Sequence, residues 1–259
     1  MKKYLADLLV SSNKKLHSNY TLLKLTQNTP FPEMCPGQFV EIKVENSPTT
    51  FLRRPISINY LDRIKNELWL LIQIVGAGTE KLAELKEGDI VNLMYPLGKT
   101  FTIPQEKKSK KMLLIGGGVG TAPLLFLGAE LKNLEHAPVF LLGARTSDGM
   151  LQLDTFRQLG TVYITTEDGS QGEKGYVTNH SILKNPDFDR IYACGPKQMM
   201  MAVAGYAKKH AIPCEVSLEN LMACGIGACL CCVENTIDGH ICVCTEGPVI
   251  NIEKLTWQI

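Results

Sequence analysis

The chain lacks an excess of charge of either sign. Its 259 residues carry 27 lysines and arginines against 26 aspartates and glutamates, a formal net charge of +1 at pH 7. A strongly basic chain would suit nucleic acid or an anionic membrane surface, and this balance gives no electrostatic case for either. We therefore expect no nucleic-acid partner and no membrane partner.

The chain also lacks an unbroken apolar run of membrane-spanning length. The stretch from Met112 to about Leu131 is apolar, but it contains three consecutive glycines, further glycines and a proline. Such punctuation predicts strand, turn and helix in place of a spanning helix. The first residues, MKKYLADLLV, have no long apolar core and no small-residue cleavage site, so we expect no signal peptide and a cytoplasmic protein.

Histidine is scarce, and no Ser-His-Asp triad is visible. The five histidines are scattered, and we interpret His180, His210 and His240 as surface or packing residues. We see no internal repeat and no low-complexity segment. We therefore expect no catalytic side chain, and the chemistry should come from bound cofactors.

Cysteine, in contrast, is plentiful. Nine cysteines in a chain without a secretion signal favour metal or redox chemistry over disulfides. Four of them form the pattern C-x4-C-x2-C followed by an eleven-residue gap: Cys224, Cys229, Cys232 and Cys244. The first two spacings, x4 and x2, match those of plant-type [2Fe–2S] proteins. Gly225 and Gly227 would allow the loop to fold tightly around such a cluster.

A structural zinc site is the alternative for these cysteines. Zinc sites commonly present two C-x2-C pairs, whereas only one is present here, so the spacing favours iron and sulfur. The third ligand stays open between Cys231 and Cys232, although Cys232 preserves the x2 gap. Cys242 likewise competes with Cys244 for the fourth place.

The pattern of apolar residues divides the chain into three domains, 1–104, 105–211 and 212–259. The first contains short strand-like runs at 20–27, 37–44, 53–61, 66–75 and 89–98, typical of an antiparallel barrel, and one candidate helix from Thr79 to about Leu85. A lysine-rich segment at 107–111 marks the boundary. Strands at 112–118, 138–144, 161–167 and 189–195 then alternate with helices at 121–134 and about 197–210, which predicts a parallel sheet covered on both faces. The last domain holds the cysteines and a hairpin at about 233–244.

A glycine loop joins a predicted strand to a predicted helix in the second domain. In GGGVGTAPL, from Gly116 to Leu124, backbone amides and the helix start could receive a pyrophosphate. The compressed spacing is neither G-x-G-x-x-G nor a P-loop. Taken singly, the loop leaves nucleotide binding and a plain βα turn equally open.

A second anion-binding motif lies in the first domain. In RRPISI, Arg54 supplies a forked donor and Ser57 a hydroxyl, and both could reach one pyrophosphate where Pro55 bends the strand. Taken alone, an edge strand with a surface arginine explains the same residues.

In combination the motifs are much more specific. The order R-P-I-S, V-G-A-G-T (75–79), P-L-G (96–98), GGGVGTAPL and A-C-G-P (193–196) resembles the ferredoxin–NADP reductase superfamily. With the cysteine pattern and C-T-E-G-P, essentially the whole chain resembles the electron-transfer subunits of NAD-dependent (class B) dihydroorotate dehydrogenases. The resemblance implies a multi-domain β + α/β fold: a flavin-binding barrel, a dinucleotide-binding domain with a parallel sheet, and a small [2Fe–2S] subdomain.

The resemblance also implies the site residues. Residues matched to the FAD site are Arg54, Pro55, Ile56, Ser57, Leu71, Ile72, Gln73, Gly78 and Thr79. Residues matched to the NAD site are Gly116, Gly117, Gly118, Gly120 and Thr121, with Cys194, Gly195 and Pro196 reaching toward nicotinamide and flavin. Cys224, Cys229, Cys232 and Cys244 match the cluster ligands. Many relatives carry arginine where Gln73 stands and glycine where Cys231 stands, and NAD in preference to NADP rests on the resemblance alone.

The implied function is electron transfer in de novo pyrimidine (UMP) biosynthesis. Electrons would pass from a partner dihydroorotate dehydrogenase subunit containing FMN, through the [2Fe–2S] cluster and FAD, to NAD+, in a heterotetramer with two copies of each subunit. One alternative is a sister reductase of the ferredoxin:NADP oxidoreductase, sulfide dehydrogenase or hydrogenase type, in which aspartate often replaces the first cluster cysteine; Cys224 argues against it. Others are a self-sufficient reductase for a diffusible acceptor and a nucleotide-responsive binding module with structural zinc.

Overall fold

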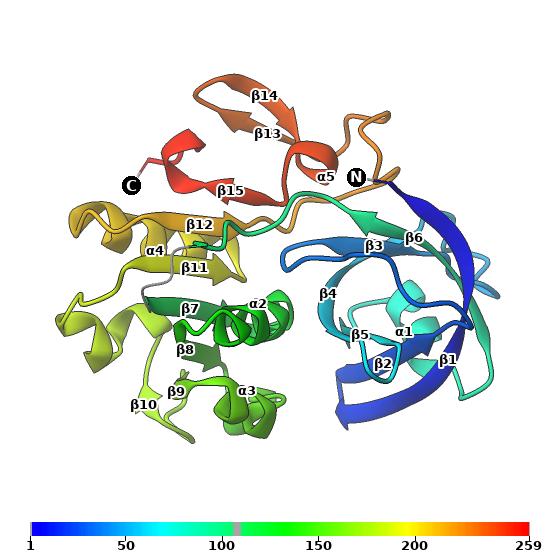
Figure 1. Ribbon diagram of the computed structural model, residues 1–259, viewed down its shortest axis with the longest axis horizontal. Coiled ribbons are helices and arrows are strands. Elements are labelled where there is room, and N and C mark those ends of the chain that lie inside the picture. The colour runs from blue at the N-terminus through cyan, green and yellow to red at the C-terminus, as the bar shows by residue number, and fades with distance from the viewer. Residues whose placement is uncertain (1, 106–109, 259) are drawn as a thin grey trace.

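The computed structural model describes residues 2–105 and 110–258. The predicted lysine-rich boundary at 107–111 therefore lies largely outside the described residues. Within them, a β-barrel and an α/β layer lie next to each other, and the cysteine-rich segment spans the top of both (Figure 1).

Six antiparallel strands close a barrel in the order β1-β2-β5-β4-β3-β6. Their bounds are β1 Tyr4–His17, β2 Tyr20–Thr26, β3 Phe39–Ile42, β4 Arg54–Asp62, β5 Glu67–Gln73 and β6 Ile90–Leu97. Alternate residues such as Leu23 and Leu25, or Leu68 and Leu70, are fully buried in the barrel core, as the period of two requires. The predicted barrel is confirmed.

β1 was not among the predicted strands. Its polar stretch at residues 11–15 does not look like a strand, but it pairs with β2 while the preceding residues pair with β6. The closed barrel thus stabilises a segment whose own sequence is weakly strand-like. The predicted helix in this domain forms as α1 (Ala77–Glu84).

The α/β layer contains a seven-stranded sheet in the order β10-β9-β8-β7-β11-β12-β15. The strands are β7 Lys111–Gly117, β8 Ala137–Ala144, β9 Thr161–Thr166, β10 Glu173–Lys174, β11 Arg190–Cys194, β12 Cys214–Ser217 and β15 Val249–Asn251, and the helices are α2 Ala122–Asn133, α3 Leu153–Leu159 and α4 Lys197–Lys209. All pairs are parallel except β12 with β15.

Helices cover both faces of this sheet, as predicted. On β7, Leu113 and Ile115 share a core with residues of α4, whereas Met112 and Leu114 share one with residues of α2. Since neighbouring residues of a strand point to opposite faces, α2 and α4 lie on opposite sides. On its other side α2 contacts the barrel, where Phe126 packs edge-on against Tyr60 of β4.

The cysteine-rich segment is woven into the sheet edge. β13 (Val233–Thr236) and β14 (Gly239–Cys242) form the predicted hairpin, followed by the short helix α5 (Val243–Glu246). β12 and β15, both from residues 212–259, extend the sheet, although the sequence placed this range in a separate cluster subdomain. The division into three domains stays a prediction, and the third part shares its core with the second.

Among the described residues, no helix is both long enough and apolar enough to cross a bilayer.

Candidate functional site

The glycine loop between β7 and α2 packs against the end of β11. Gly116 pairs with Cys194 in the β7–β11 register. A methyl group on Gly120 would lie 2.4 Å from the Cys194 carbonyl oxygen, and one on Gly117 would lie 2.7 Å from a methionine sulfur. At Gly120, where the neighbour is backbone, only glycine permits this close approach. The structure thus brings the predicted dinucleotide loop (Gly116 to Thr121) next to the predicted Cys194–Pro196 segment.

A buried thiol and a carboxyl group meet beside this loop. Cys194 Sγ lies 3.9 Å from an oxygen of Glu219, and the side chain of Ser217 also contacts the thiol. Burial raises the pKa of Cys194 well above its usual value, so the thiol stays neutral. Surrounding protein atoms also desolvate the Glu219 carboxyl and raise its pKa. The thiol therefore keeps its proton, and its contact with Glu219, whose side chain is also partly open to solvent, disfavours negative charge at the carboxyl edge of the sheet.

The residues assigned to FAD converge at one end of the barrel. Arg54, Pro55, Ile56 and Ser57 begin β4, and Leu71, Ile72 and Gln73 end the neighbouring β5. A methyl group on Gly78 would lie 2.8 Å from Arg54 Nε, so the guanidinium packs closely against the start of α1. A forked cation next to a helix start suits a diphosphate.

Not every predicted side chain in this group is available to a ligand. Ile56 and Ile72 pack in the barrel core. The Thr79 hydroxyl donates to the Gly76 carbonyl and accepts from the Val75 and Gly76 amides, at 2.9–3.2 Å. Thr79 therefore stabilises the turn, and these three residues can meet a cofactor only through their backbone. Leu71 instead faces the seam between the domains, where it packs with Ala122.

The four predicted cluster cysteines gather around one loop. Gly225 and Gly227 adopt positive φ angles of 67° and 83°, so the amides that follow them turn toward sulfur. The Ile226 and Ala228 amides donate to Cys224 Sγ at 3.5 and 3.3 Å, and the Gly227 amide donates to Cys244 Sγ at 3.2 Å. These contacts are the kind that stabilise metal-bound thiolates and tune their potential.

The thiols form two pairs. Cys229 hydrogen-bonds to Cys224, and Cys232 to Cys244, whose amide also donates to Cys232 Sγ at 3.4 Å. The backbone amide of Ile226, with help from Cys229 and Ala228, lowers the pKa of Cys224 to about 6. Burial and the neighbouring thiol raise the pKa of Cys244. Cys224 is thus a thiolate at neutral pH, the form that binds metal.

The donor set fits a [2Fe–2S] cluster better than zinc. Among the residues that the structure describes, no three His, Cys, Asp or Glu side chains converge on a position for a single metal ion. A structural zinc ion needs four ligands around one point, whereas a [2Fe–2S] cluster takes two ligands on each of two irons. Two thiol pairs joined by an amide-rich loop match the second requirement.

The structure distinguishes the candidates for the third ligand clearly and those for the fourth ligand less clearly. Cys231 is exposed and takes no part in the contacts above, which favours Cys232 as the third ligand. Cys242 is half-buried. Burial is the main cause of its raised pKa, and the charges of Cys232, Cys224 and Cys229 add to the increase, so Cys242 lies near the four predicted ligands. Cys242 ends β14, whereas Cys244 lies in the turn of helix that begins at Val243.

A buried carboxyl group lies where the barrel meets the cluster loop. Glu41 of β3 pairs with Pro55 on one side, and its side chain lies under Gly225, whose added methyl group would be 2.8 Å from Glu41 Cγ. Glu41 is fully buried, and neither carboxylate oxygen has a hydrogen-bond partner in the described part of the chain. Burial raises its pKa to about 7, against the opposing effect of Arg53.

Two family models match the chain. Residues 219–256 match the iron-sulfur cluster binding domain of dihydroorotate dehydrogenase B, and residues 114–205 match the oxidoreductase NAD-binding domain. A protein of Bacillus mycoides (strain KBAB4), described as the electron transfer subunit of dihydroorotate dehydrogenase B (NAD(+)), is 38% identical over 255 residues, 96% of this chain and 97% of the relative. Another from Lysinibacillus sphaericus (strain C3-41), with the same description, is 39% identical over 93% of this chain and 94% of the relative.

The chain belongs to this family of dihydroorotate dehydrogenase B electron transfer subunits. Solved structures agree with the fold. An NADH-dependent reduced ferredoxin-NADP oxidoreductase has a TM-score of 0.86 and 28% identity, covering 97% of this chain and 90% of that one. A ferredoxin NADP+ reductase from Neisseria gonorrhoeae, with bound FAD and NADP, has a TM-score of 0.65 and 15% identity over 79% and 91%, which shows the shared fold alone.

Sequence reasoning missed Glu41 and Glu219 in this family member. Glu41 carries a visible signal, since it is a lone acid within the apolar run GQFVEIKV. Glu219 stands five residues before the first cluster cysteine, but nothing in the sequence ties it to Cys194.

Proposed function

We propose that this chain is the electron transfer subunit of an NAD-dependent dihydroorotate dehydrogenase. It would take electrons from a partner catalytic subunit that holds FMN and deliver them to NAD+. The observation that carries this proposal is the near full-length match to electron transfer subunits, combined with two thiol pairs in the loop that matches their cluster domain.

Each cofactor has a set of residues to hold it. We assign the diphosphate of FAD to Arg54 and Ser57 beside Gly78, the diphosphate of NAD to the loop from Gly116 to Thr121, and the [2Fe–2S] cluster to Cys224, Cys229, Cys232 and Cys244. When bound, FAD can exchange one or two electrons, the cluster exchanges one, and NAD exchanges two as a hydride, so the flavin joins the other two.

The chain's own residues then position these groups and control protons. Gly117, Gly120 and Gly195 keep the dinucleotide loop tight against the end of β11. Burial raises the pKa of both Cys194 and Glu219, which disfavours negative charge at the edge where nicotinamide and flavin are expected to meet. Amides from Ile226 to Ala228 stabilise negative charge on the cluster sulfurs.

The setting of this activity is also part of the proposal. We propose a heterotetramer with two catalytic partner subunits, acting in pyrimidine biosynthesis in the cytoplasm. Nine free cysteines within the described residues fit a reducing compartment. The exposed side chains Leu221, Ile226 and Leu230 border the cluster loop, where a partner must approach for electrons to cross.

The decisive experiment is anaerobic purification of the tagged chain from its native host. We expect a stoichiometric subunit containing FMN to co-purify, and the complex to reduce NAD+ with dihydroorotate. A ferredoxin-linked or larger iron-sulfur partner, with no dihydroorotate activity, would move the chain to the sister reductases, a second candidate favoured by the TM-score of 0.86. A colourless protein containing zinc would reject both.

A further inference from the structure

One glycine of the dinucleotide loop differs from its neighbours. Methyl groups on Gly116, Gly117 and Gly120 would each meet protein atoms at 2.4–2.8 Å, so these three face inward. A methyl group on Gly118 would have a single neighbour within 4 Å among the described residues, the Tyr20 hydroxyl at 3.9 Å. Gly118 therefore faces open space, and the Tyr20 side chain of the barrel borders this space.

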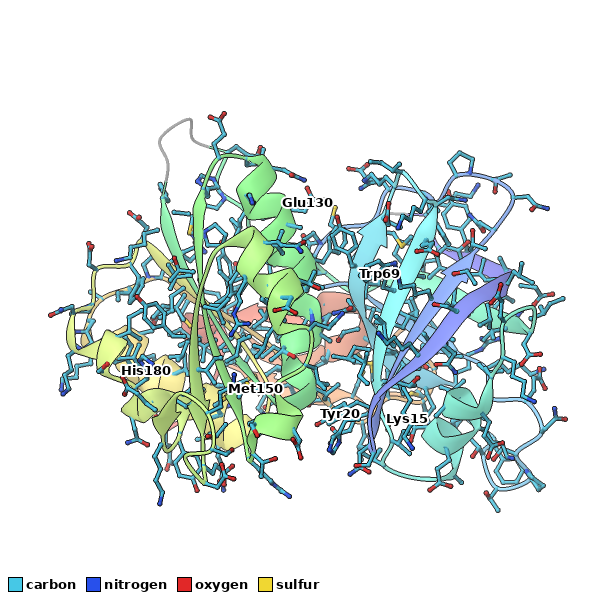
Figure 2. All side chains as sticks on the ribbon, turned by 90° about the horizontal axis from the view of Figure 1, so that it is seen from below. Lys15, Tyr20, Trp69, Glu130, Met150 and His180 are labelled. Atoms are coloured by element: carbon cyan, nitrogen blue, oxygen red, sulfur yellow. The ribbon has the colours of Figure 1, made fainter. Side chains whose placement is uncertain are left out.

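Tyr20 reaches this position from the barrel. It begins β2 opposite Gln73, at the end of the strand assigned to the flavin. Tyr20 packs against a small apolar cluster made of Leu71 of β5, Ala122 at the start of α2, and Leu151. Figure 2 shows Tyr20 at the seam between the barrel and the α/β layer. One side chain thus borders both the predicted flavin site and the predicted dinucleotide site.

The phenol is prepared to donate a hydrogen bond. Its hydroxyl makes no hydrogen bond to any residue in 2–105 or 110–258. Partial burial raises the pKa of Tyr20, with an opposing effect from Arg145 and a further increase from Glu219. The hydroxyl therefore keeps its proton at physiological pH. Arg145 follows β8, is exposed, and its positive charge reaches the Tyr20 hydroxyl, which favours an anion there.

We propose that Tyr20 is a dinucleotide-binding residue whose hydroxyl donates a hydrogen bond to the NAD diphosphate held by the glycine loop. The inference rests on the proposed function and adds a contact from the barrel, so the dinucleotide is held from both domains. A ligand gripped across the seam also fixes its nicotinamide relative to the flavin strand.

Tyr20→Phe tests this because it removes the hydroxyl and keeps the ring. We measure the dissociation constants of NADH and NAD+ by isothermal titration on protein purified anaerobically with its FAD and cluster. A hydrogen bond to a charged group predicts affinity about tenfold weaker or more. FAD, iron and sulfide contents should match the parent chain. Unchanged affinity in Tyr20→Phe would overturn the proposal.

The matched control is Tyr60→Phe. Tyr60 is also a barrel phenol at the domain seam, but it packs against Phe126 and Trp69, away from the glycine loop. We expect parental affinity for this variant. An equal loss in both variants would show that Tyr20 acts through seam packing, and would overturn the proposed contact.

ADP-ribose identifies the part of the ligand that Tyr20 contacts. It keeps the diphosphate and lacks the nicotinamide ring, so Tyr20→Phe should weaken it by the same factor as NAD+. A loss confined to NAD+ and NADH would overturn the diphosphate contact. If the parent chain itself does not bind NADH, the NAD site of the proposed function is rejected. If the parent chain binds NADH and Tyr20→Phe binds it equally well, only the proposed role of Tyr20 is rejected.

Discussion

Glu41 places a carboxyl group in an environment that disfavours its charged form. It is enclosed between the strand that carries Arg54 and the loop that carries Cys224, and its oxygens have no hydrogen-bond partner among the described residues. Its pKa rises from 4.5 to about 7 chiefly through burial. In the unfolded chain the same group ionises near pH 4.3. Protonation of Glu41 is therefore linked to folding.

The sign of this linkage gives a prediction. Between about pH 4.5 and 7 the folded chain binds the proton that the unfolded chain has lost, so the free energy of unfolding falls as pH rises and levels off above pH 7. The loss is on the order of 3 kcal/mol. Glu41→Gln should remove it, so urea unfolding at pH 5 and 8 should differ less than in the parent. Identical pH profiles for both proteins would contradict the assignment.

Two neighbouring exposed cysteines have different roles. Cys229 hydrogen-bonds to Cys224, whereas Cys231 takes no part in the thiol contacts. Cys229→Ser should lose most of the iron and sulfide while keeping FAD, because serine replaces one of four thiolate ligands. Cys231→Ser, the matched control, should retain both. Iron and sulfide analysis with electron paramagnetic resonance checks this pair, and loss of the cluster in Cys231→Ser would make Cys231 the third ligand in place of Cys232.

At the scale of elements, the βα turn after β7 depends on its contact with the end of β11. The two strands are neighbours in a parallel sheet, and their loops leave from the same edge. The sequence alone predicts both elements and their loops. It does not predict that Gly120 lies against the Cys194 carbonyl, because that contact joins segments far apart in the chain.

Gly120→Ala tests this contact. The new methyl group would lie 2.4 Å from a backbone oxygen, so the loop must shift. We expect a loss of about 1–3 kcal/mol in stability from this overpacking and clearly weaker NADH binding. Gly76→Ala is the stability control, since nothing lies within 4 Å of its added methyl group and its φ of 169° is open to any residue. Equal melting temperatures for the two variants would show that the loop adapts.

At the scale of the whole molecule, the cysteine-rich segment contributes to the core of the α/β layer. The segment's buried apolar residues share one hydrophobic core with Leu113 of β7: Val216, Ile250, Ile252 and Leu255. Cys232 and Cys244 belong to this hydrophobic core as well. The cluster loop is therefore anchored by the sheet edge, which fixes it against the barrel at Glu41.

Truncation after Leu218 measures this contribution. The deletion removes β15 and several fully buried side chains, so we expect a loss of about 5 kcal/mol or more and a melting temperature lower by about 10–20 °C. The truncation removes both the cluster ligands and the packed segment. Cys229→Ser separates these two causes of instability, because it should lose the cluster while keeping the segment. If the truncated chain melts like Cys229→Ser, the segment is an independent subdomain.

The sequence by itself determined the features that reside in short stretches of chain. The C-x4-C-x2-C spacing, the glycine loop and the R-P-I-S strand are local, so the residues in each stretch fix the backbone that the chemistry needs. Alternating apolar residues likewise predicted most of the barrel strands and the covered parallel sheet, because strand and helix periods are local too.

Only the tertiary structure decided which stretches meet. The pairing of Cys194 with Glu219, the burial of Glu41 under Gly225 and the approach of Tyr20 to Gly118 each join segments distant in sequence. β1 and β15 likewise exist as strands only because neighbours supply their hydrogen bonds. Such contacts arise from the packing of the barrel, the sheet and the cysteine-rich segment against one another, and no periodicity within a single stretch records that packing.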